Sequence, residues 1–330
     1  MSDRKPVLEI EDLSVAYQTA NGLVNAVNDV NLKVYPEEIV GLVGESGSGK
    51  STMAYAIMRL LKGDAFVTKG HIKVMGEDLY ALSPKELRKF RWNKISMVFQ
   101  SAMSALNPVM TVQTQIVDTL TSHRPEMSKA EAIKRAGELL DVVRIDRKHL
   151  NSYPHELSGG MRQRVVIAIA IALSPGFVIM DEPTTALDVV VQRSILDQIR
   201  EIQQVEKFAV LFISHDFSLV AELASQVAIM YAGRIVELTK SGTLRLGERH
   251  HPYTEGLLRA IPHLTADEVV IEGIPGTPPN LVNLPSGCAF YPRCPLATDE
   301  CRKARPNLYQ TDNAIIECHL FKGDREVQHV

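Results

Sequence analysis

A glycine-rich segment at residues 44–51 constrains the fold of this 330-residue chain more than any other feature. It reads Gly-Glu-Ser-Gly-Ser-Gly-Lys-Ser and fully matches the phosphate-binding pattern G-x-x-x-x-G-K-[ST]. The apolar run 39–43 precedes it, and residues 50–61 are expected to continue as a helix. This order of strand, loop and helix predicts an α/β sheet with its ligand at the carboxyl ends of the strands.

The chemistry of this loop suits a nucleoside triphosphate. Its glycines let successive backbone N–H groups converge on phosphate oxygens, and the helix adds the positive end of its dipole. Lys50 is expected to neutralise the β- and γ-phosphates, and Ser51 to bind Mg²⁺. A simple glycine-rich turn before a helix is the plainer interpretation, but the preceding strand and the intact Lys-Ser pair count against it. The residues expected to contact the nucleotide are Gly44, Glu45, Ser46, Gly47, Ser48, Gly49, Lys50, Ser51 and Thr52.

Two further apolar runs end in polar residues. Residues 177–180 are followed by Asp181 and Glu182, and residues 210–213 by Ser214 and His215. Both runs have the continuous apolar character of buried parallel strands. Their polar ends favour a functional site at the sheet edge over a purely structural role.

Other stretches predict the surrounding elements. Residues 7–17 and 22–34 alternate apolar and polar side chains, as half-buried antiparallel strands do. Residues 128–143 have apolar side chains at helical spacing. After about residue 250 many prolines and all four cysteines occur, which predicts a small, loop-rich C-terminal extension.

Charge and hydropathy limit the class of partner. With 36 basic and 39 acidic side chains the net charge is −3, which argues against nucleic acid as the main partner. No apolar run reaches the roughly 18 residues of a membrane-spanning helix. The N-terminus lacks the apolar core of a signal peptide. We therefore expect an intracellular protein whose membrane part, if it has one, is supplied by other subunits.

A second motif lies at residues 157–164, Leu-Ser-Gly-Gly-Met-Arg-Gln-Arg. A helix cap would explain Ser158, but not Gly159 and Gly160, because glycine weakens the first turn of a helix. An anion bound at unpaired N–H groups explains all three residues. Together with the phosphate loop, this stretch resembles the signature of the ATP-binding cassette family. In that family the signature completes the ATP site of a partner subunit.

The resemblance implies a fold and a domain division. The expected fold is an α/β P-loop nucleotide-binding domain over residues 1–250, with a RecA-like core, an antiparallel β subdomain and a helical subdomain at about 101–165. Residues 251–330 would form the extension. Met161 stands where many family members have glutamine, which removes no backbone donor.

The resemblance also assigns roles to acidic residues. Asp181 would hold Mg²⁺ as the Walker B carboxylate, and Glu182 would polarise the attacking water as the catalytic base. The run 181–188 matches the Walker B and D-loop motifs together, which places Asp188 at the nucleotide.

Three other side chains take roles from their order in the family. Gln100, after the apolar run 95–99, resembles the Q-loop glutamine that contacts the metal and the attacking water. His215 resembles the switch histidine that reaches the γ-phosphate. Tyr17 is positioned to stack on adenine, although an aromatic residue on a strand is more often a packing residue.

Three stretches narrow the resemblance to the ATPases of peptide and nickel importers. Residues 99–108, Phe-Gln-Ser-Ala-Met-Ser-Ala-Leu-Asn-Pro, are similar to their Q-loop, whose surroundings receive a coupling helix of the membrane subunit. Residues 251–262 are similar to the start of their C-terminal extension. Residues 285–295 are similar to its cysteine-bearing region.

The four cysteines favour a metal site. Clustered thiols inside a cell indicate a metal more often than a disulfide, and four sulfur ligands suit zinc or an iron–sulfur cluster. No C-x-x-C pair is present, so the usual zinc pattern is missing. The resemblance implies a 4Fe–4S cluster, while zinc and free or oxidised cysteines stay open. The proposed ligands are Cys288, Cys294, Cys301 and Cys318.

The implied function is that of an ATPase subunit, using ATP and Mg²⁺, in an importer of di- or oligopeptides at the cytoplasmic face of the membrane. Its partners would be two transmembrane permease subunits, an extracytoplasmic substrate-binding protein and a second ATPase subunit, which the family favours as a related chain over an identical copy. Nickel chelates and oligosaccharides are alternative cargoes. A soluble cassette ATPase without a transport role is a further alternative, which the single cassette disfavours.

Overall fold

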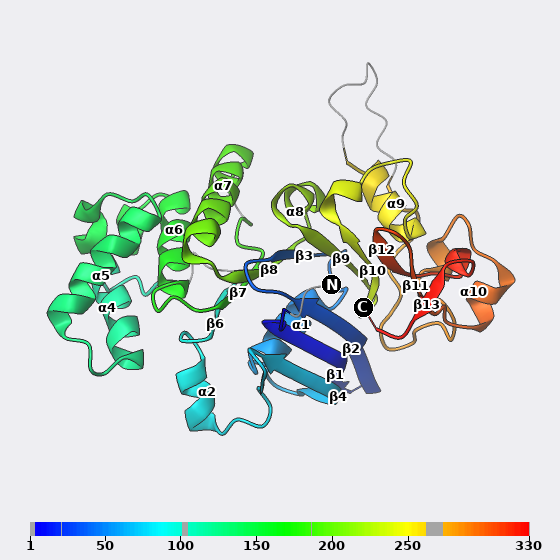
Figure 1. The fold of residues 1–330 in the computed structure, drawn as a ribbon, viewed down its shortest axis with the longest axis horizontal. Helices are drawn as coiled ribbons and strands as arrows, with labels where there is room; N and C mark the ends of the chain where they lie inside the picture. The colour runs from blue at the N-terminus through cyan, green and yellow to red at the C-terminus, as the bar shows by residue number, and fades with distance from the viewer. Residues whose placement is uncertain (1–3, 21, 101–104, 186, 262–272, 330) are drawn as a thin grey trace, which may run out of the picture. The chain divides into compact units, whose positions relative to one another are not determined.

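The computed structural model describes residues 4–20, 22–100, 105–185, 187–261 and 273–329 (Figure 1). The chain divides into two compact units: unit 1 draws on residues 1–8, 34–38 and 74–212, and unit 2 on residues 9–33, 39–73 and 213–330. This is a different division from the predicted domains 1–250 and 251–330, whose boundary stays a prediction. Across the described residues, no helix is both long and apolar enough to cross a membrane.

Unit 1 is built on buried parallel strands. Strand β7 pairs in parallel with β6, with Ile95 opposite Phe177, and has β8 as its other neighbour. Every residue of these three strands is buried, which is why each is a continuous apolar run. The elements of unit 1 are β5 (Glu77–Asp78), α2 (Pro84–Phe90), β6 (Ile95–Val98), α4 (Val112–His123), α5 (Lys129–Val142), α6 (Gly159–Ala170), β7 (Phe177–Asp181), α7 (Val189–Glu206) and β8 (Ala209–Ser214, whose last two residues belong to unit 2), with 3-10 helices at Arg147–Asn151 and Pro154–Glu156.

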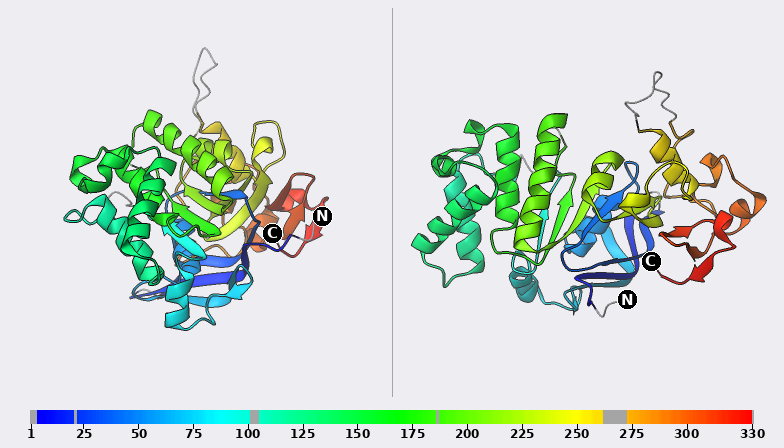
Figure 2. Two further views of the ribbon diagram at one scale, coloured as in Figure 1. Left: turned by 60° about the vertical axis from the view of Figure 1, so that its left-hand side comes forward. Right: turned by 45° about the horizontal axis from the view of Figure 1, so that its top comes forward.

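Unit 1 contains the helices α4, α5 and α6, which pack against one another. Helix α5 packs against α4 and α6, which appear as the green helices of Figure 2. It begins with a capping box, in which Ser128 and Glu131 bond each other's backbone N–H groups. Its buried side chains, including Ala132, Leu139 and Leu140, recur at helical spacing. The helix predicted at 128–143 is therefore confirmed.

Unit 2 contains two groups of strands. The strands β2, β1 and β4 are neighbours in that order, and β3 pairs in parallel with β9, which pairs antiparallel with β10. The elements are β1 (Leu8–Thr19), β2 (Gly22–Val34), β3 (Ile39–Val43), α1 (Lys50–Ile57), β4 (Ala65–Val74), α8 (Phe217–Leu223), β9 (Gln226–Tyr231), β10 (Arg234–Lys240), α9 (Pro252–Arg259), α10 (Asp299–Lys303), β11 (Leu308–Gln310), β12 (Ala314–Glu317) and β13 (Arg325–Val327), with 3-10 helices at Ser241–Thr243, Tyr291–Arg293 and His319–Phe321. The helix after the phosphate loop is shorter than predicted and ends at Ile57.

Helix α8 packs closely on β3, the strand that leads into the phosphate loop. A Cβ atom on Gly41 would lie 2.0 Å from Cγ1 of Val220, far inside contact distance. Gly41 therefore interrupts the apolar run of β3 because the helix approaches the strand backbone at this residue.

The C-terminal segment is less loop-rich than expected. Strand β12 pairs antiparallel with β10, with Thr239 opposite Ala314, and β11 and β13 continue the same sheet (Figure 1). An ion pair supports this junction: Nε of Arg234 lies 3.0 Å from Oε1 of Glu317. The C-terminal segment is thus part of unit 2 and is bonded through its backbone to β10, which the sequence does not predict.

Two buried histidines precede α9. Burial alone would lower the pKa of His250, but its hydrogen bond to the Glu237 carboxylate, 2.7 Å from Nδ1, raises it. The neighbouring His251 lacks such a carboxylate partner at its ring, and burial lowers its pKa to about 3. Its Nδ1 accepts the backbone N–H of Tyr253 at 3.0 Å and so caps α9.

The buried, neutral His251 makes the fold sensitive to acid. An unfolded histidine takes up a proton near pH 6.5, whereas folded His251 takes one up only near pH 3. Between these values the unfolded state binds more protons, so this residue lowers the free energy of unfolding by about 1.4 kcal/mol for each pH unit of acidification. His251→Asn keeps an acceptor for the N–H of Tyr253 but does not titrate. We expect its free energy of unfolding, measured by denaturant titration between about pH 6 and pH 4, to fall less steeply than that of the wild type. Parallel pH profiles would contradict this assignment.

Candidate nucleotide-binding site

The phosphate loop connects β3 to α1 in unit 2. Ser46 and Gly47 at its tip are exposed, whereas Lys50 is 6% exposed. The Lys50 ammonium donates hydrogen bonds to the carbonyl oxygens of Gly44 at 2.7 Å and Glu45 at 2.9 Å, so the loop curls around its own lysine. This is the geometry of a backbone cradle with a cation at its base.

Backbone geometry requires glycine in this loop. Gly49 has a φ of 106°, and a Cβ atom there would lie 2.2 Å from the carbonyl oxygen of Ala26. Gly47 has a φ of 78° at the open tip of the loop. Both conformations are rare for residues with a side chain, so the motif glycines follow from the loop's own shape.

The turn between β9 and β10 supports the loop from one side. The N–H of Gly233 donates to the carbonyl oxygen of Ser48 at 2.9 Å, and its own carbonyl accepts from the N–H of Asn28 at 2.8 Å. Ala232 and Gly233 both have positive φ values, 47° and 83°, which is typical of a tight hairpin turn. The hairpin thereby fixes the carboxyl half of the phosphate loop.

Tyr17 and His215 are also part of unit 2. The Tyr17 hydroxyl lies 3.0 Å from Oγ1 of Thr52, which places this half-buried ring beside the start of α1. His215 is exposed at the end of β8. Its turn is fixed because Asp216 donates its N–H to Oγ of Ser214 at 3.0 Å and caps α8. Adenine stacking by Tyr17 and γ-phosphate sensing by His215 stay predictions.

In unit 1 the structure brings two predicted catalytic residues together. Nε2 of Gln100 donates to Oε2 of Glu182 at 2.9 Å, and the hydroxyl of Thr185 donates to the same oxygen at 3.0 Å. Glu182 has a φ of 47°, a left-handed conformation that is unusual for a residue with a side chain. Asp181, the last residue of β7, is fully buried. The conformation of Glu182 is therefore held by its neighbours.

The signature stretch forms the start of α6. Ser158 is its N-cap and accepts the N–H of Met161 at 3.3 Å, so the cap interpretation is correct for this residue. A Cβ atom on Gly160 would lie 2.9 Å from Cγ1 of Val191, in the first turn of α7. Asp188 caps α7 by accepting the N–H of Val191 at 2.9 Å. Close packing of α6 on α7 is thus a second reason for glycine at position 160.

The predicted site residues fall into two sets. Unit 2 holds the phosphate loop, Tyr17 and His215, while unit 1 holds Gln100, Asp181, Glu182, Asp188 and the signature residues Ser158, Gly159 and Gly160. Residues 101–104 of the Q-loop stretch and Ala186 lie outside the described residues.

The cysteines are free thiols near the end of unit 2. The N–H of Cys288 donates to the carbonyl oxygen of Cys301 at 2.8 Å, and Sγ of Cys301 lies 3.3 Å from Oγ1 of Thr298. Burial, together with a smaller contribution from neighbouring cysteines, raises the pKa of Cys288 to about 11 and that of Cys318 to about 12. In the part of the chain that the structure describes, no three metal-ligating side chains lie close enough to hold an ion. The thiols as placed therefore do not form a ligand set, and the expected cluster is not confirmed.

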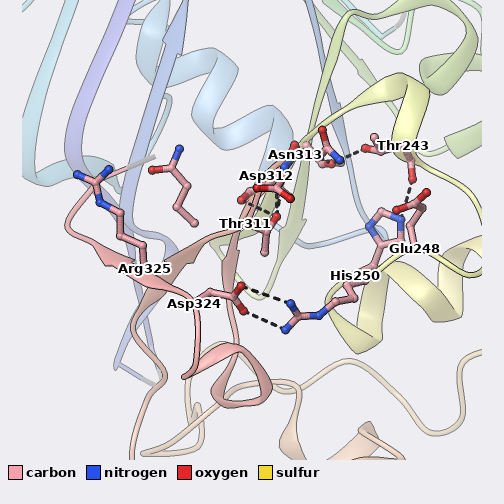
Figure 3. Close-up of a pocket in the computed structure, with 12 residues that line it drawn as sticks. Thr243, Glu248, His250, Thr311, Asp312, Asn313, Asp324 and Arg325 are labelled. Carbon is pink, nitrogen blue, oxygen red and sulfur yellow. Dashed lines mark hydrogen bonds and ion pairs between the residues drawn. The ribbon is translucent and has the colours of Figure 1, made fainter.

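A polar pocket of about 480 Å³ is lined by β10, β11–β13 and the residues that precede α9 (Figure 3). Its polar side chains bond mainly to one another: Arg249 forms an ion pair with Asp324, with Nη2 2.9 Å from Oδ2, and the hydroxyls of Thr239 and Thr243 lie 3.0 Å apart. Nε2 of His250 lies 3.0 Å from the carbonyl oxygen of Thr243. Because these polar groups bond to one another, they do not indicate a particular ligand. None of the predicted site residues lines this pocket.

Besides Gly233 of the supporting hairpin, two more residues contact the phosphate loop and were not predicted. The Tyr253 hydroxyl accepts the backbone N–H of Glu45 at 2.9 Å, and Arg293 forms an ion pair with the Glu45 side chain at 2.7 Å. Both lie in stretches that resemble the importer ATPases, but no local pattern links either of them to residue 45.

Comparisons with known proteins define the class. Residues 27–185 match the family described as ABC transporter, and residues 236–301 match the family described as Oligopeptide/dipeptide transporter, C-terminal region. The solved structures that resemble the chain include the dimeric post-hydrolysis state of the ATP-binding cassette MJ0796 bound to ADP and Pi. The TM-score is 0.63 at 29% sequence identity, over 71% of this chain and 98% of that one. Unit 1 and unit 2 are thus parts of an ATP-binding cassette.

Relatives place the chain within that class. The dipeptide transport ATP-binding protein DppD of Caldanaerobacter subterraneus is 39% identical over 98% of this chain and 99% of its own length. The oligopeptide transport ATP-binding protein OppD of Mycobacterium tuberculosis is 47% identical over 96% of this chain, which spans 53% of that relative. The chain therefore spans about half the length of the mycobacterial relatives it matches. It belongs to the ATP-binding cassette family, in the group of oligopeptide and dipeptide transport ATP-binding proteins.

Proposed function

We propose that this chain is the ATPase subunit of an importer of di- or oligopeptides, acting at the cytoplasmic face of the membrane. The phosphate loop supports the proposal, because its lysine lies inside a glycine-rich loop of the kind that binds phosphates. The names of the full-length relatives support the peptide cargo. Nickel chelates and oligosaccharides stay alternative cargoes, and the relatives do not favour either.

The proposed chemistry is hydrolysis of ATP by positioned water. Bound Mg²⁺ would offset the negative charge of the phosphates, with Ser51 and Gln100 as its contacts and Asp181 in its second coordination shell. Lys50 neutralises the β- and γ-phosphates, and Glu182 accepts the proton of the attacking water. Gln100, which already donates to Glu182, orients this carboxylate, and His215 contacts the γ-phosphate.

Replacing the proposed base tests this assignment. Glu182→Gln keeps the shape of the side chain but cannot accept a proton, so we expect kcat for ATP to fall by about 10²-fold or more while ATP still binds. Steady-state hydrolysis and ATP binding measure the two effects. Glu201→Gln, an exposed substitution on α7, is the matched control and should hydrolyse ATP as the wild type does. Undiminished turnover in Glu182→Gln would remove this residue from the mechanism.

We also propose that two ATPase subunits close on ATP through the signature helix. The first turn of α6 has no acidic residue that would repel an anion, so backbone N–H groups at this helix start can donate hydrogen bonds to a phosphate of a facing subunit. A related second ATPase is the proposed partner, and an identical copy is the alternative.

The same variant tests subunit closure. Since Glu182→Gln retains ATP, it should accumulate as an ATP-dependent dimer, alone or with the co-expressed second ATPase, in size-exclusion chromatography. Adding Ser158→Arg would place a bulky side chain at the start of α6 and should abolish that dimer. A dimer that forms equally well in the double variant would count against the signature contact.

The proposed membrane partners dock on an apolar groove in unit 1. This groove, about 410 Å³, is lined by aromatic and aliphatic side chains next to Gln100, among them Trp92, Phe99, Leu106, Met110 and Ile169. It suits a short coupling helix of a permease subunit, with apolar side chains facing the groove. The two permeases would receive cargo from an extracytoplasmic binding protein.

A charge in the groove tests the docking site. Met110→Glu should prevent co-purification with two co-expressed permease subunits, while ATP binding stays at the wild-type level. Lys129→Glu, on the exposed start of α5, provides a charge-changed control that should still co-purify. Retention of the permeases by Met110→Glu would contradict this docking surface, and their absence from the wild type would favour a soluble ATPase.

We further propose that Cys288, Cys294, Cys301 and Cys318 bind a 4Fe–4S cluster. The backbone contact between Cys288 and Cys301 supports a shared site, although the thiols would have to approach and lose their protons. Protein purified without oxygen should be brown and contain about four iron atoms per chain. Cys301→Ser should lose the iron. Colourless, iron-free wild type would end this proposal, and stoichiometric zinc would replace it.

A further inference from the structure

The C-terminal segment reaches the phosphate loop through Arg293. This arginine, in the 3-10 turn Tyr291–Arg293, is 7% exposed and pairs with Glu45 through two hydrogen bonds, Nη1 to Oε2 at 2.7 Å and Nη2 to Oε1 at 3.0 Å. Its Nε donates to the carbonyl oxygen of Pro275 at 2.8 Å, and Nη1 also donates to the Tyr231 hydroxyl at 3.3 Å. Such a bidentate pair, in which the arginine is buried and the glutamate half-buried, fixes both partners in one geometry.

Every polar group of Glu45 is used in this arrangement. Its N–H donates to the hydroxyl of Tyr253 at 2.9 Å, its carbonyl oxygen accepts from Nζ of Lys50 at 2.9 Å, and its carboxylate binds Arg293. Tyr253 and Arg293 thus hold the main chain and the side chain of the second residue of the loop, respectively. The position of the Lys50 ammonium depends on the same residue.

An aromatic cluster makes this support rigid. The ring of Tyr231 lies 4.6 Å from that of Tyr253 and 5.2 Å from that of Phe290, measured between centroids, and Tyr253 and Phe290 are 5.5 Å apart. All three rings are buried, and Phe290 immediately precedes the turn that carries Arg293. Because the rings pack against one another, the turn and the loop are held to one body of unit 2.

Electrostatics give the pair a role beyond support. The phosphate-binding motif allows any residue at position 45, so the acidic side chain there is not required by the motif. An unpaired Glu45 carboxylate would repel the negative charges of a bound triphosphate. Like charges repel more strongly at a protein surface than in bulk water, because the effective dielectric constant is lower there. Arg293 offsets the charge of the Glu45 carboxylate through two hydrogen bonds, so Glu45 repels an anion at the loop less strongly.

We infer that Arg293 is a positioning residue for the phosphate loop, and that the C-terminal segment sets the affinity of the loop for nucleoside triphosphate through the Arg293–Glu45 pair. This inference rests on the proposed binding of ATP by the loop. Arg293 need not touch the nucleotide, since it acts through Glu45 and Lys50.

Calorimetric titration of the full-length chain with Mg-ATP tests the inference. Arg293→Gln leaves Glu45 unpaired beside the phosphates, and we expect the ATP dissociation constant to rise at least about tenfold. KM should rise more than kcat falls, because the loss lies in binding. Arg293→Lys restores the charge but not the fork, so its dissociation constant should lie between those of Arg293→Gln and the wild type.

Tyr253→Phe provides a second variant if Arg293→Gln does not fold. It keeps the ring packing and removes only the acceptor for the Glu45 N–H, so ATP should bind several-fold more weakly. The control is Arg249→Gln, which breaks the Arg249–Asp324 ion pair elsewhere in unit 2 and should bind ATP as the wild type does.

A rescue experiment separates charge from general destabilisation. In the Arg293→Gln background, Glu45→Gln removes the unpaired carboxylate and should recover part of the ATP affinity, which a merely structural role for Arg293 would not allow. Wild-type affinity in both Arg293→Gln and Tyr253→Phe would overturn the inference while leaving the proposed ATPase intact. A wild type that does not bind Mg-ATP would instead overturn the proposed function.

Discussion

The phosphate loop depends on contacts with residues that are distant in the sequence. Its short motif determines which backbone conformations are available, but the hairpin at Gly233, the Tyr253 hydroxyl and the Arg293 guanidinium determine which one is adopted. The last two are 208 and 248 residues away from Glu45. Because a loop with several glycines loses much entropy on ordering, a preorganised anion site needs such outside support.

The acidic residues Asp181 and Glu182 of unit 1 also depend on their neighbours. Glu182 occupies a left-handed conformation that its own side chain disfavours, and hydrogen bonds from Gln100 and Thr185 converge on one of its oxygens. Strained residues persist only where the surroundings hold them, and such residues cluster at functional sites. The fully buried Asp181 beside it is the last residue of β7, so the turn that carries Glu182 starts directly from a buried strand.

The sequence predicts those parts of the fold whose signal is local. The strands β3, β7 and β8 are mostly apolar runs because they are buried on both faces. Helix α5 can be predicted from its capping box and from the helical spacing of its apolar residues. Strands β11, β12 and β13 have only three or four residues each, too few for a periodic pattern, and the nearby prolines indicate loops.

The same distinction applies to the site. Motif residues such as Lys50 and Ser158 are predicted because their spacing along the chain carries the chemistry. Arg293 and Tyr253 act on Glu45 across the fold, and no spacing reports such a contact. The proximity of Gln100 and Glu182 is anticipated only because the family order supplies it. The sequence therefore predicts the motif residues that would bind the nucleotide, but not the distant residues that hold the phosphate loop in place.

The signature helix shows how one short stretch can satisfy two requirements. The Ser158 hydroxyl is used internally, since it caps α6 at Met161, so the cap serves the helix rather than a ligand. An anion at this position would therefore bind to backbone N–H groups, because the first N–H groups of a helix have no carbonyl partner within the helix. Gly160 lets α7 approach to within contact distance of the same turn, and Asp188 fixes the start of α7. A larger residue at position 160 would push α7 away and shift the donors together, so packing and anion binding both favour glycine at this position.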